Sequence, residues 1–249
     1  MRGSWLALGV CLCGVWGCAA APRTPSPPAP LPIVYAETPP VVDGKADDAV
    51  WGKAAVLTAR CAVGRAGQGE DAATARLAWD ARCLYGVIAI KDKDVHYLHT
   101  TNTQPLWLAD CAGVFVKPRE DRLAFLEVET NPFGAVMAVA WPSRGMGSKQ
   151  RLACGETAAG IAVATTVLGT VNDWRDVDEG WVVEFAIPWA CCREVFPQAP
   201  EPGDVWRVNV CGFDFSAYRE QELLFSVAEG LQGRFSEYEK FPLMVLRGR

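Results

Sequence analysis

The chain has 249 residues, of which 50% are hydrophobic and 21% charged, so it has enough apolar material for one folded domain and is neither disordered nor a coiled coil. Its 24 Lys and Arg against 29 Asp and Glu give a net charge of -5, which argues against a nucleic-acid-binding surface. Only two histidines are present, which excludes a His-rich metal centre. Ten tryptophans are the first indication that some aromatic rings face a ligand instead of the core.

The N-terminus predicts export. Residues 1–21 begin with a positive charge at Arg2, continue as a nearly unbroken apolar run and end in small residues, as secretory signal peptides do. The alternative is an uncleaved anchor helix, because residues 4–21 are just long enough to span a bilayer. Residues 15–18 are similar to a bacterial lipobox, which would make Cys18 the lipidated first residue of the mature chain. We therefore expect either a membrane-anchored lipoprotein of the bacterial cell envelope or a secreted or periplasmic protein.

A proline-rich segment follows the signal. Residues 22–32 contain six prolines and predict an extended tether, because proline donates no backbone hydrogen bond to a helix or sheet. The folded domain is therefore expected to span residues 33–249, at the end of that tether.

The remainder of the chain predicts short strands, many with period-two alternation, separated by turns. The strands are expected at 74–79, 83–90, 111–116, 124–130, 134–141, 161–168, 181–187, 205–213, 222–227 and 241–246. Helical turns are indicated only at 47–52 and 188–193, and no Gly-rich phosphate loop follows a strand. The predicted fold is all-β, an antiparallel two-sheet sandwich of about ten strands with jelly-roll or immunoglobulin-like organisation.

Seven cysteines lie beyond Cys18, at positions 61, 83, 111, 154, 191, 192 and 211. An odd number cannot all pair, and their spacing matches no small disulfide framework. We expect most of them to be buried as small hydrophobic side chains. The alternative is that some of them form one or two disulfides whose pairing the sequence does not assign.

Six segments, in the same order, resemble family 9 carbohydrate-binding modules and their relatives. They are 41–51, 78–85 with Asp92 beyond it, 106–115, 180–189, 202–209 and 235–241. The resemblance covers residues 34–246. It implies a β-sandwich that binds sugars without cleaving them and that often accompanies a glycoside hydrolase domain.

The resemblance also implies site residues. Trp107 and Phe235 match the two aromatic positions that clamp a sugar, Asp92 matches a hydroxyl-binding carboxylate, and Gln232 stands where sugar-binding members have Asn. A pyranose ring has apolar C–H faces that stack on aromatic rings and a rim of hydroxyls that needs polar partners.

Two positions depart from the sugar-binding pattern of the family. Gly113 stands in place of a Glu, and Glu127 in place of an Arg. We retain Glu127 as a rim contact, so the expected ligand-binding residues are Trp107, Phe235, Asp92, Glu127 and Gln232. The departures favour, as an alternative, an envelope structural or interaction protein with a degenerate sugar site.

Other interpretations remain open at this stage. Glu127 and Glu129, two residues apart, fall on one sheet face and leave a glycoside hydrolase as the third function. Trp107 fits the core as well as a ligand site, and Trp174 in an acidic loop at 172–179 is a second ligand candidate. That loop, or Asp92 with Asp94, suits a structural calcium ion, and no other cofactor is indicated.

Overall fold

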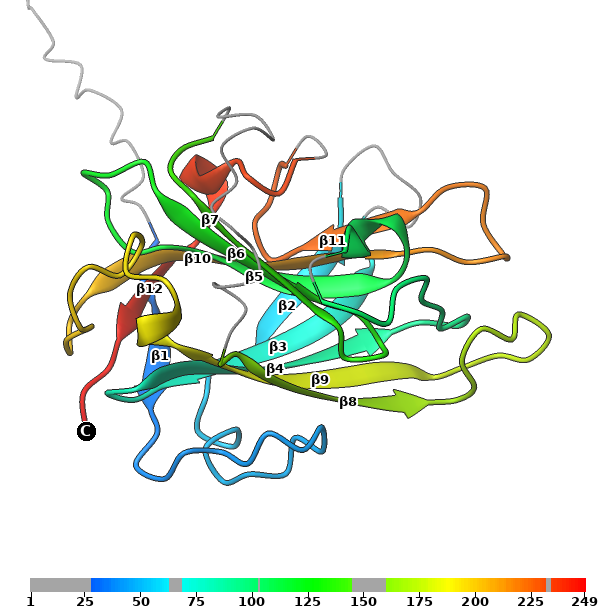
Figure 1. Ribbon diagram of the computed structural model, residues 1–249, viewed down its shortest axis with the longest axis horizontal. Coiled ribbons are helices and arrows are strands. Elements are labelled where there is room, and N and C mark those ends of the chain that lie inside the picture. Colours follow the sequence, from blue (N-terminus) through cyan, green and yellow to red (C-terminus); the bar gives the residue numbers. More distant parts are fainter. Residues whose placement is uncertain (1–27, 63–68, 103, 145–159, 232–233) are drawn as a thin grey trace, which may run out of the picture.

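Short strands and turns alternate along the chain, and in a computed structural model they form two facing layers (Figure 1). The structure describes residues 28–62, 69–102, 104–144, 160–231 and 234–249. The strands are β1 Leu31–Tyr35, β2 Leu57–Cys61, β3 Asp71–Trp79, β4 Cys83–Lys91, β5 Cys111–Lys117, β6 Phe125–Thr130, β7 Val136–Trp141, β8 Ala162–Leu168, β9 Gly180–Pro188, β10 Val205–Asp214, β11 Leu223–Ser226 and β12 Leu243–Leu246. The described residues contain three short 3₁₀ helices: η1 Leu106–Leu108, η3 Trp189–Cys191 and η4 Tyr238–Lys240. Within the described part of the chain, no helix has the length and apolarity needed to cross a bilayer.

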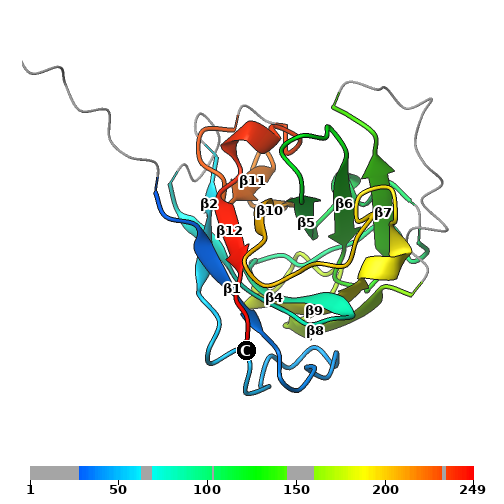
Figure 2. The same ribbon diagram turned by 90° about the vertical axis from the view of Figure 1, so that its left-hand side faces the viewer.

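The first layer has the strand order β7-β6-β5-β10 and the second has β3-β4-β9-β8. Two links join β10 to β3, one through β11 and β2 and the other through β12 and β1. Figure 2 shows β1 and β12 side by side along the joined edge of the sandwich. The predicted all-β sandwich is confirmed.

Two details of the predicted fold are corrected. The described residues contain twelve strands, because β1 and β2 add to the predicted ten, and β1 pairs in parallel with both β12 and β3. β1 starts at Leu31 and includes Pro32, so the last two residues of the predicted tether belong to a strand. Proline has no backbone N–H to donate to a sheet. It is tolerated near the start of a short strand, where one residue need not donate.

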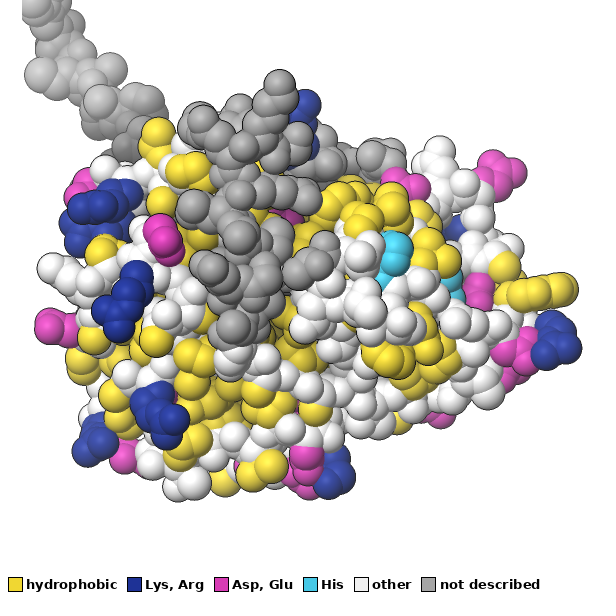
Figure 3. All heavy atoms as spheres, in the orientation of Figure 1, with side chains coloured by type: hydrophobic (Ala, Val, Ile, Leu, Met, Phe, Trp, Pro, Cys, Tyr) yellow, Lys and Arg dark blue, Asp and Glu magenta, His cyan; other side chains and the backbone are white. Residues whose placement is uncertain are grey.

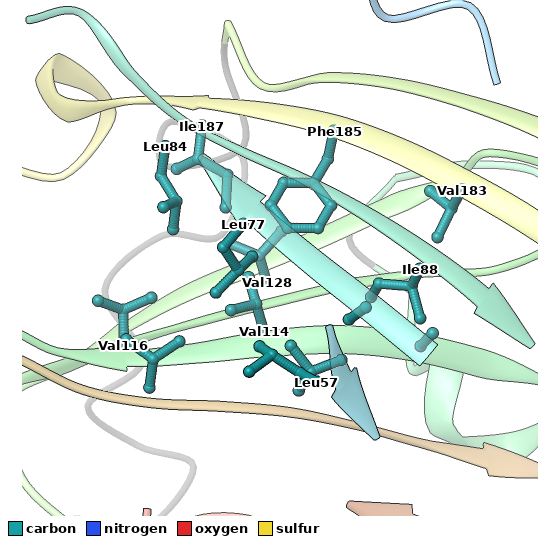
Figure 4. Close-up of a cluster of buried hydrophobic side chains, with 14 of the residues drawn as sticks. Leu57, Leu77, Leu84, Ile88, Val114, Val116, Val128, Val183, Phe185 and Ile187 are labelled. Carbon is teal, nitrogen blue, oxygen red and sulfur yellow. The ribbon is translucent and has the colours of Figure 1, made fainter. Parts of the chain in front are cut away.

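Side chains from alternate strand positions fill the space between the layers. Leu77, Leu84 and Phe185 of the second layer meet Val114 and Val128 of the first (Figure 4). Burying each such aliphatic or aromatic side chain contributes about 1.5–3 kcal/mol, which makes this interlayer cluster the main source of stability.

Two predicted hairpins have side-chain locks in their turns. Asp80 Oδ1 accepts the backbone N–H groups of Arg82 (2.7 Å) and Cys83 (2.8 Å), which closes the turn between β3 and β4. Asn131 Oδ1 accepts the N–H of Ala135 (3.0 Å) in the turn between β6 and β7. Asx side chains favour turns for this reason, so the turn signals in the sequence are confirmed.

The outer face of the second layer is closed by the segment between β1 and β2. Glu184 of β9 points outward yet is 1% exposed, because Trp51 Nε1 donates to its Oε1 (2.9 Å). Its Oε2 accepts the backbone N–H groups of Asp43 (3.1 Å) and Gly44 (2.9 Å). One buried carboxylate therefore fixes this covering segment to the sheet.

All six cysteines in the described ranges are free thiols: Cys61, Cys83, Cys111, Cys191, Cys192 and Cys211. Burial raises the pKa of Cys191 to about 12 and that of Cys192 to about 11, so neither is a reactive thiolate at neutral pH. Four of the six are buried, as expected of most of the cysteines, and Cys83 and Cys191 are half-buried, while Cys154 lies outside the described residues.

Candidate functional site

The outer face of the first layer combines aromatic and acidic side chains. Residues that alternate with the core positions of β5, β6, β7 and β10 point outward here. Trp107, Trp141 and Phe213 are half-buried on this face and pack against one apolar cluster. The buried members of that cluster are Leu106, Cys111, Ala135, Met137 and Val139.

The segment that carries Trp107 is attached to the hairpin between β6 and β7. Asn131 Nδ2 donates to the carbonyl of His99 (2.8 Å), and Asn102 Oδ1 accepts the N–H of Val136 (2.9 Å). These bonds hold the start of the segment, and η1 then sets the Trp107 ring on the apolar cluster.

Phe235 lies on the same outer face, among a second group of aromatic residues. Its ring centroid is 5.0 Å from that of Phe213 and 6.3 Å from that of Phe115. Phe213 and Trp141 pack against both clusters, so they bridge the two predicted clamp residues. Phe235 is only 9% exposed, however, and so offers a ligand little of its ring surface.

Glu127 has a defined partner on this face. Trp141 Nε1 donates a hydrogen bond to Glu127 Oε2, and the Trp141 ring stacks on Phe125 with centroids 6.2 Å apart. The carboxylate of Glu127 thus orients a half-buried indole ring while remaining half-buried itself. Trp141 lies at the end of β7, as the predicted strand at 134–141 indicates.

Close packing between β5 and β6 explains why position 113 is a glycine. A Cβ at Gly113 would lie 2.4 Å from the carbonyl oxygen of Val128 and 3.1 Å from Cγ of Glu129. Gly113 and Glu129 are register partners on β5 and β6, and both are outward-facing positions. The Glu129 side chain therefore occupies the space that a side chain at position 113 would need.

Asp92 does not join the aromatic face. It is 2% exposed, and its Oδ1 accepts the N–H of Asp94 (2.9 Å). Burial, followed by the charges of Asp110 and Asp214, raises the pKa of the Asp92 carboxyl to about 9. Its position continues the inward-facing residues of β4, so it faces the interior of the sandwich instead of a ligand on the surface.

The acidic loop and the Asp92–Asp94 pair are engaged in other interactions. Asp94 Oδ2 accepts the N–H of Ala217 (2.6 Å), Asp173 pairs with Arg175 (2.6 Å), and Asp178 Oδ2 accepts the N–H of Val95 (2.8 Å). These contacts hold the loop segments together, and a structural calcium ion at either place stays a prediction.

A separate groove lies beside this loop. Its volume is about 400 Å³, and its lining includes Asp94, His96, Asn172, Trp174 and Phe215. Trp174 is 62% exposed, and the hydroxyl of Tyr218 lies 2.8 Å from the Trp174 carbonyl oxygen. The second predicted ligand candidate is therefore an exposed aromatic residue, and its groove adjoins the aromatic face through Phe215, whose ring centroid is 6.4 Å from that of Phe213.

Two predicted residues, Gln232 and Cys18, lie outside the described residues. Sequence reasoning missed Trp141 and Phe213 on the aromatic face. The signal that could have found them is the period of two along β7 and β10, since both residues fall on the positions that alternate with the core.

The Lys and Arg side chains of the described residues are spread over the face shown in Figure 3 and do not gather into one basic patch there. On the face shown in Figure 3, Lys and Arg side chains are spaced mostly toward the periphery, and hydrophobic side chains reach the surface between them. Arg144 pairs with Glu239, and Arg207 pairs with Glu120, so these two cations are already bound to acidic partners.

The fold and this face define a β-sandwich module with a sheet surface of aromatic and acidic side chains. The chain belongs to the carbohydrate family 9 binding domain-like family, whose model matches residues 42–224.

Individual relatives agree with this assignment. The exoglucanase XynX of Acetivibrio thermocellus is 26% identical over 150 residues, which are 60% of this chain and 12% of that protein. A family 9 carbohydrate-binding module of Caldicellulosiruptor kristjanssonii, solved with cellotriose, has a TM-score of 0.61 at 16% identity and aligns over 89% of this chain and 95% of its own. A family 9 module of the same organism solved with glucose has a TM-score of 0.60 at 17% identity, over 87% of this chain and 96% of its own. At these identities the structural likeness establishes a shared fold.

Proposed function

We propose that this domain binds carbohydrate, without cleaving it, on the outer face of the first layer. The observation that carries the proposal is the set of three half-buried aromatic rings, Trp107, Trp141 and Phe213, gathered on one sheet face beside Glu127. Family membership supports it, as do the neighbouring structures that hold cellotriose and glucose.

The chemistry of the face suits a sugar. Partly exposed indole rings stack on the C–H faces of a pyranose, and a carboxylate accepts hydrogen bonds from its hydroxyls. Glu127 fixes the Trp141 ring in advance, so the ring loses little conformational entropy when a ligand arrives. Trp107 is held through the bonds that anchor its segment to the β6–β7 hairpin.

The cellular setting is part of the proposal. We infer an exported protein, anchored through a lipid at Cys18 or released after signal cleavage, with the domain held away from the membrane by residues 22–32. The exoglucanase relative supports a role beside a glycoside hydrolase in carbohydrate breakdown.

A binding measurement on Trp107→Ala tests the proposal. We expect cello- or xylo-oligosaccharides to quench tryptophan fluorescence of the wild-type protein, and the variant to bind at least about 30-fold more weakly, as the loss of a central aromatic contact costs about 2 kcal/mol or more. Trp174→Ala is the matched control, since it removes an exposed tryptophan at another place and should leave the affinity unchanged.

Other outcomes of this screen would contradict the proposal. A folded wild-type protein that binds no glycan on a broad array would favour the envelope interaction protein with a degenerate site. Loss of binding in Trp174→Ala alone would move the ligand to the groove beside Phe215. Release of reducing sugar that is abolished by Glu127→Gln or Glu129→Gln would establish a hydrolase instead.

A further inference from the structure

The aromatic face extends along the strands of the first layer. Phe213 is the register partner of Cys111, the first residue of β5. Trp141 is the register partner of Phe125, the first residue of β6, which lies beside the end of β5 because the two strands are antiparallel. The seven residues of β5 span about 20 Å at a rise of about 3.3 Å per residue. A saccharide chain that follows the strands away from Phe213 therefore leaves this face at Trp141.

A pocket opens beside Trp141, where β6 begins and β7 ends. Its volume is about 330 Å³, and its lining consists of Arg122, Leu123, Ala124, Trp141, Pro142 and Glu194. Small-ligand sites typically have volumes of about 300–1,000 Å³, so this pocket is large enough to count as one. Leu123 is 61% exposed and provides an apolar surface in the same pocket as the indole ring.

The two charged side chains of the pocket, Arg122 and Glu194, are both exposed. Neither forms an ion pair with the other or with any other residue of the described ranges. Glu194 Oε2 accepts a hydrogen bond from the Cys192 thiol at 3.8 Å. Burial raises the pKa of that thiol to about 11, so it keeps its proton at neutral pH and continues to donate. The pocket thus holds a guanidinium and a positioned carboxylate that do not neutralise each other.

This combination of groups suits a neutral sugar. The Arg122 guanidinium offers only donors and the Glu194 carboxylate only acceptors, whereas a sugar hydroxyl both donates and accepts. Neighbouring hydroxyls can therefore bind both side chains while the C–H face of the ring packs on Trp141 and Leu123. A negatively charged ligand would be repelled by Glu194, and a positively charged one by Arg122.

We propose that Arg122, Leu123, Trp141 and Glu194 form an additional subsite, which binds further units of a neutral saccharide chain held on the aromatic face. This subsite rests on the proposed function, because it extends the same binding surface beyond Trp141. The Trp141 ring belongs to both parts, and its hydrogen bond to Glu127 sets its orientation before any ligand arrives. Affinity should therefore increase with the length of the saccharide chain, since only a longer chain reaches Arg122 and Glu194.

Titration calorimetry on the full chain tests the subsite by comparing short and long ligands. The ligands are neutral cello- and xylo-oligosaccharides, each used as the disaccharide and as the hexasaccharide. We expect the wild-type protein to bind the preferred hexasaccharide at least about tenfold more tightly than its disaccharide. Arg122→Ala and Glu194→Ala should each remove most of this ratio, because each deletes hydrogen bonds that only the long chain makes with a charged group. A purely structural role would weaken the binding of both ligands alike.

Arg193→Ala is the matched control. Arg193 is also an exposed arginine and is the sequence neighbour of Glu194, but it lines a different groove. We expect this variant to keep the wild-type ratio of hexasaccharide to disaccharide affinity. Circular dichroism and the Tm show whether each variant is folded, and Arg122→Gln and Glu194→Gln replace any alanine variant that is not.

Failure of the subsite differs from failure of the proposed function. Equal wild-type affinities for the short and long ligands would overturn the subsite while leaving sugar binding intact. So would an unchanged ratio in folded Arg122→Ala and Glu194→Ala, an equal loss for both ligands, or the same reduced ratio in Arg193→Ala. A wild-type protein that binds none of these saccharides would contradict the proposed function, and the subsite with it.

Discussion

The outer faces of the two layers each carry a tryptophan whose indole N–H donates to a glutamate. On the second layer Trp51 donates to Glu184, and on the first layer Trp141 donates to Glu127. Glu184 is 1% exposed and also accepts two backbone N–H groups. Glu127 is half-buried, on the face that carries the partly exposed aromatic rings.

This difference distinguishes a structural role for the Trp51–Glu184 pair from a binding role for the Trp141–Glu127 pair, although both consist of the same two residue types. The covering segment between β1 and β2 uses the carboxylate of Glu184 to attach itself to the sheet, so this carboxylate is not available to a ligand. On the first layer the glutamate fixes the orientation of one ring, and the neighbouring rings reach solvent. Burial of the carboxylate, and not the Trp–Glu pair itself, therefore distinguishes the two faces.

Removing the buried carboxylate should have the largest effect. Glu184→Ala leaves three donors without an acceptor, and we expect the free energy of unfolding to fall by about 3–5 kcal/mol. Urea unfolding measures this change as a lower midpoint at an unchanged slope. Glu184→Gln keeps one acceptor oxygen and should lose less.

The matching change on the first layer is Glu127→Ala. It removes one acceptor from a half-buried pair, so we expect the free energy of unfolding to fall by no more than about 1.5 kcal/mol. Equal losses from Glu184→Ala and Glu127→Ala would show that the two glutamates have the same structural role, against the contrast drawn from their burial.

The next largest effect concerns Gly113, the outward position beside Glu129. A Cβ there meets a backbone carbonyl at 2.4 Å, so Gly113→Ala forces β5 and β6 apart and should lower the free energy of unfolding by about 1–3 kcal/mol. Gly52→Ala is the control, because its Cβ would have ordinary contact at 3.6 Å from the Ala49 carbonyl oxygen. A Gly113→Ala protein as stable as Gly52→Ala would remove the packing explanation for this glycine.

Much of the architecture could be predicted from the sequence because alternation and turn residues act locally. The hairpin turns at Asp80 and Asn131 lock through their own neighbours, and the paired strands follow from their apolar period. β1 escaped prediction because its partners, β12 and the end of β3, are far away in sequence and pair with it in parallel.

The site was less predictable because it depends on register between strands. Gly113 suggested a lost carboxylate, yet the register of β5 with β6 places the Glu129 side chain in that space. Asp92 was assigned to a sugar by resemblance, although continuing the period of β4 by one step places it inward. The resemblance thus placed Trp107 and Phe235 among the aromatic residues of this face, while Trp141, Phe213 and the acidic positions required the three-dimensional pairing.

The smallest expected effect comes from removing a single hydrogen bond from each of the two Trp–Glu pairs. Trp141→Phe keeps an aromatic ring on Phe125 but removes the N–H donor to Glu127, and we expect the free energy of unfolding to fall by about 0.5–1.5 kcal/mol. Trp51→Phe removes the equivalent donor from the buried Glu184 and should cost about 1.5–3 kcal/mol. Urea denaturation of the two variants side by side measures the gap.

The two phenylalanine variants should also differ in ligand binding. Trp141→Phe frees the ring to rotate, so glycan affinity measured by titration calorimetry should fall several-fold, while Trp51→Phe should leave it unchanged because its ring lies on the opposite layer. If Trp51→Phe weakened glycan binding as much as Trp141→Phe while the protein remained folded, the binding surface could not be confined to the first layer. If only Trp141→Phe weakened glycan binding, the half-buried Trp141–Glu127 pair would be the one that serves binding. The comparison is direct because both variants remove an indole N–H that donates to a glutamate.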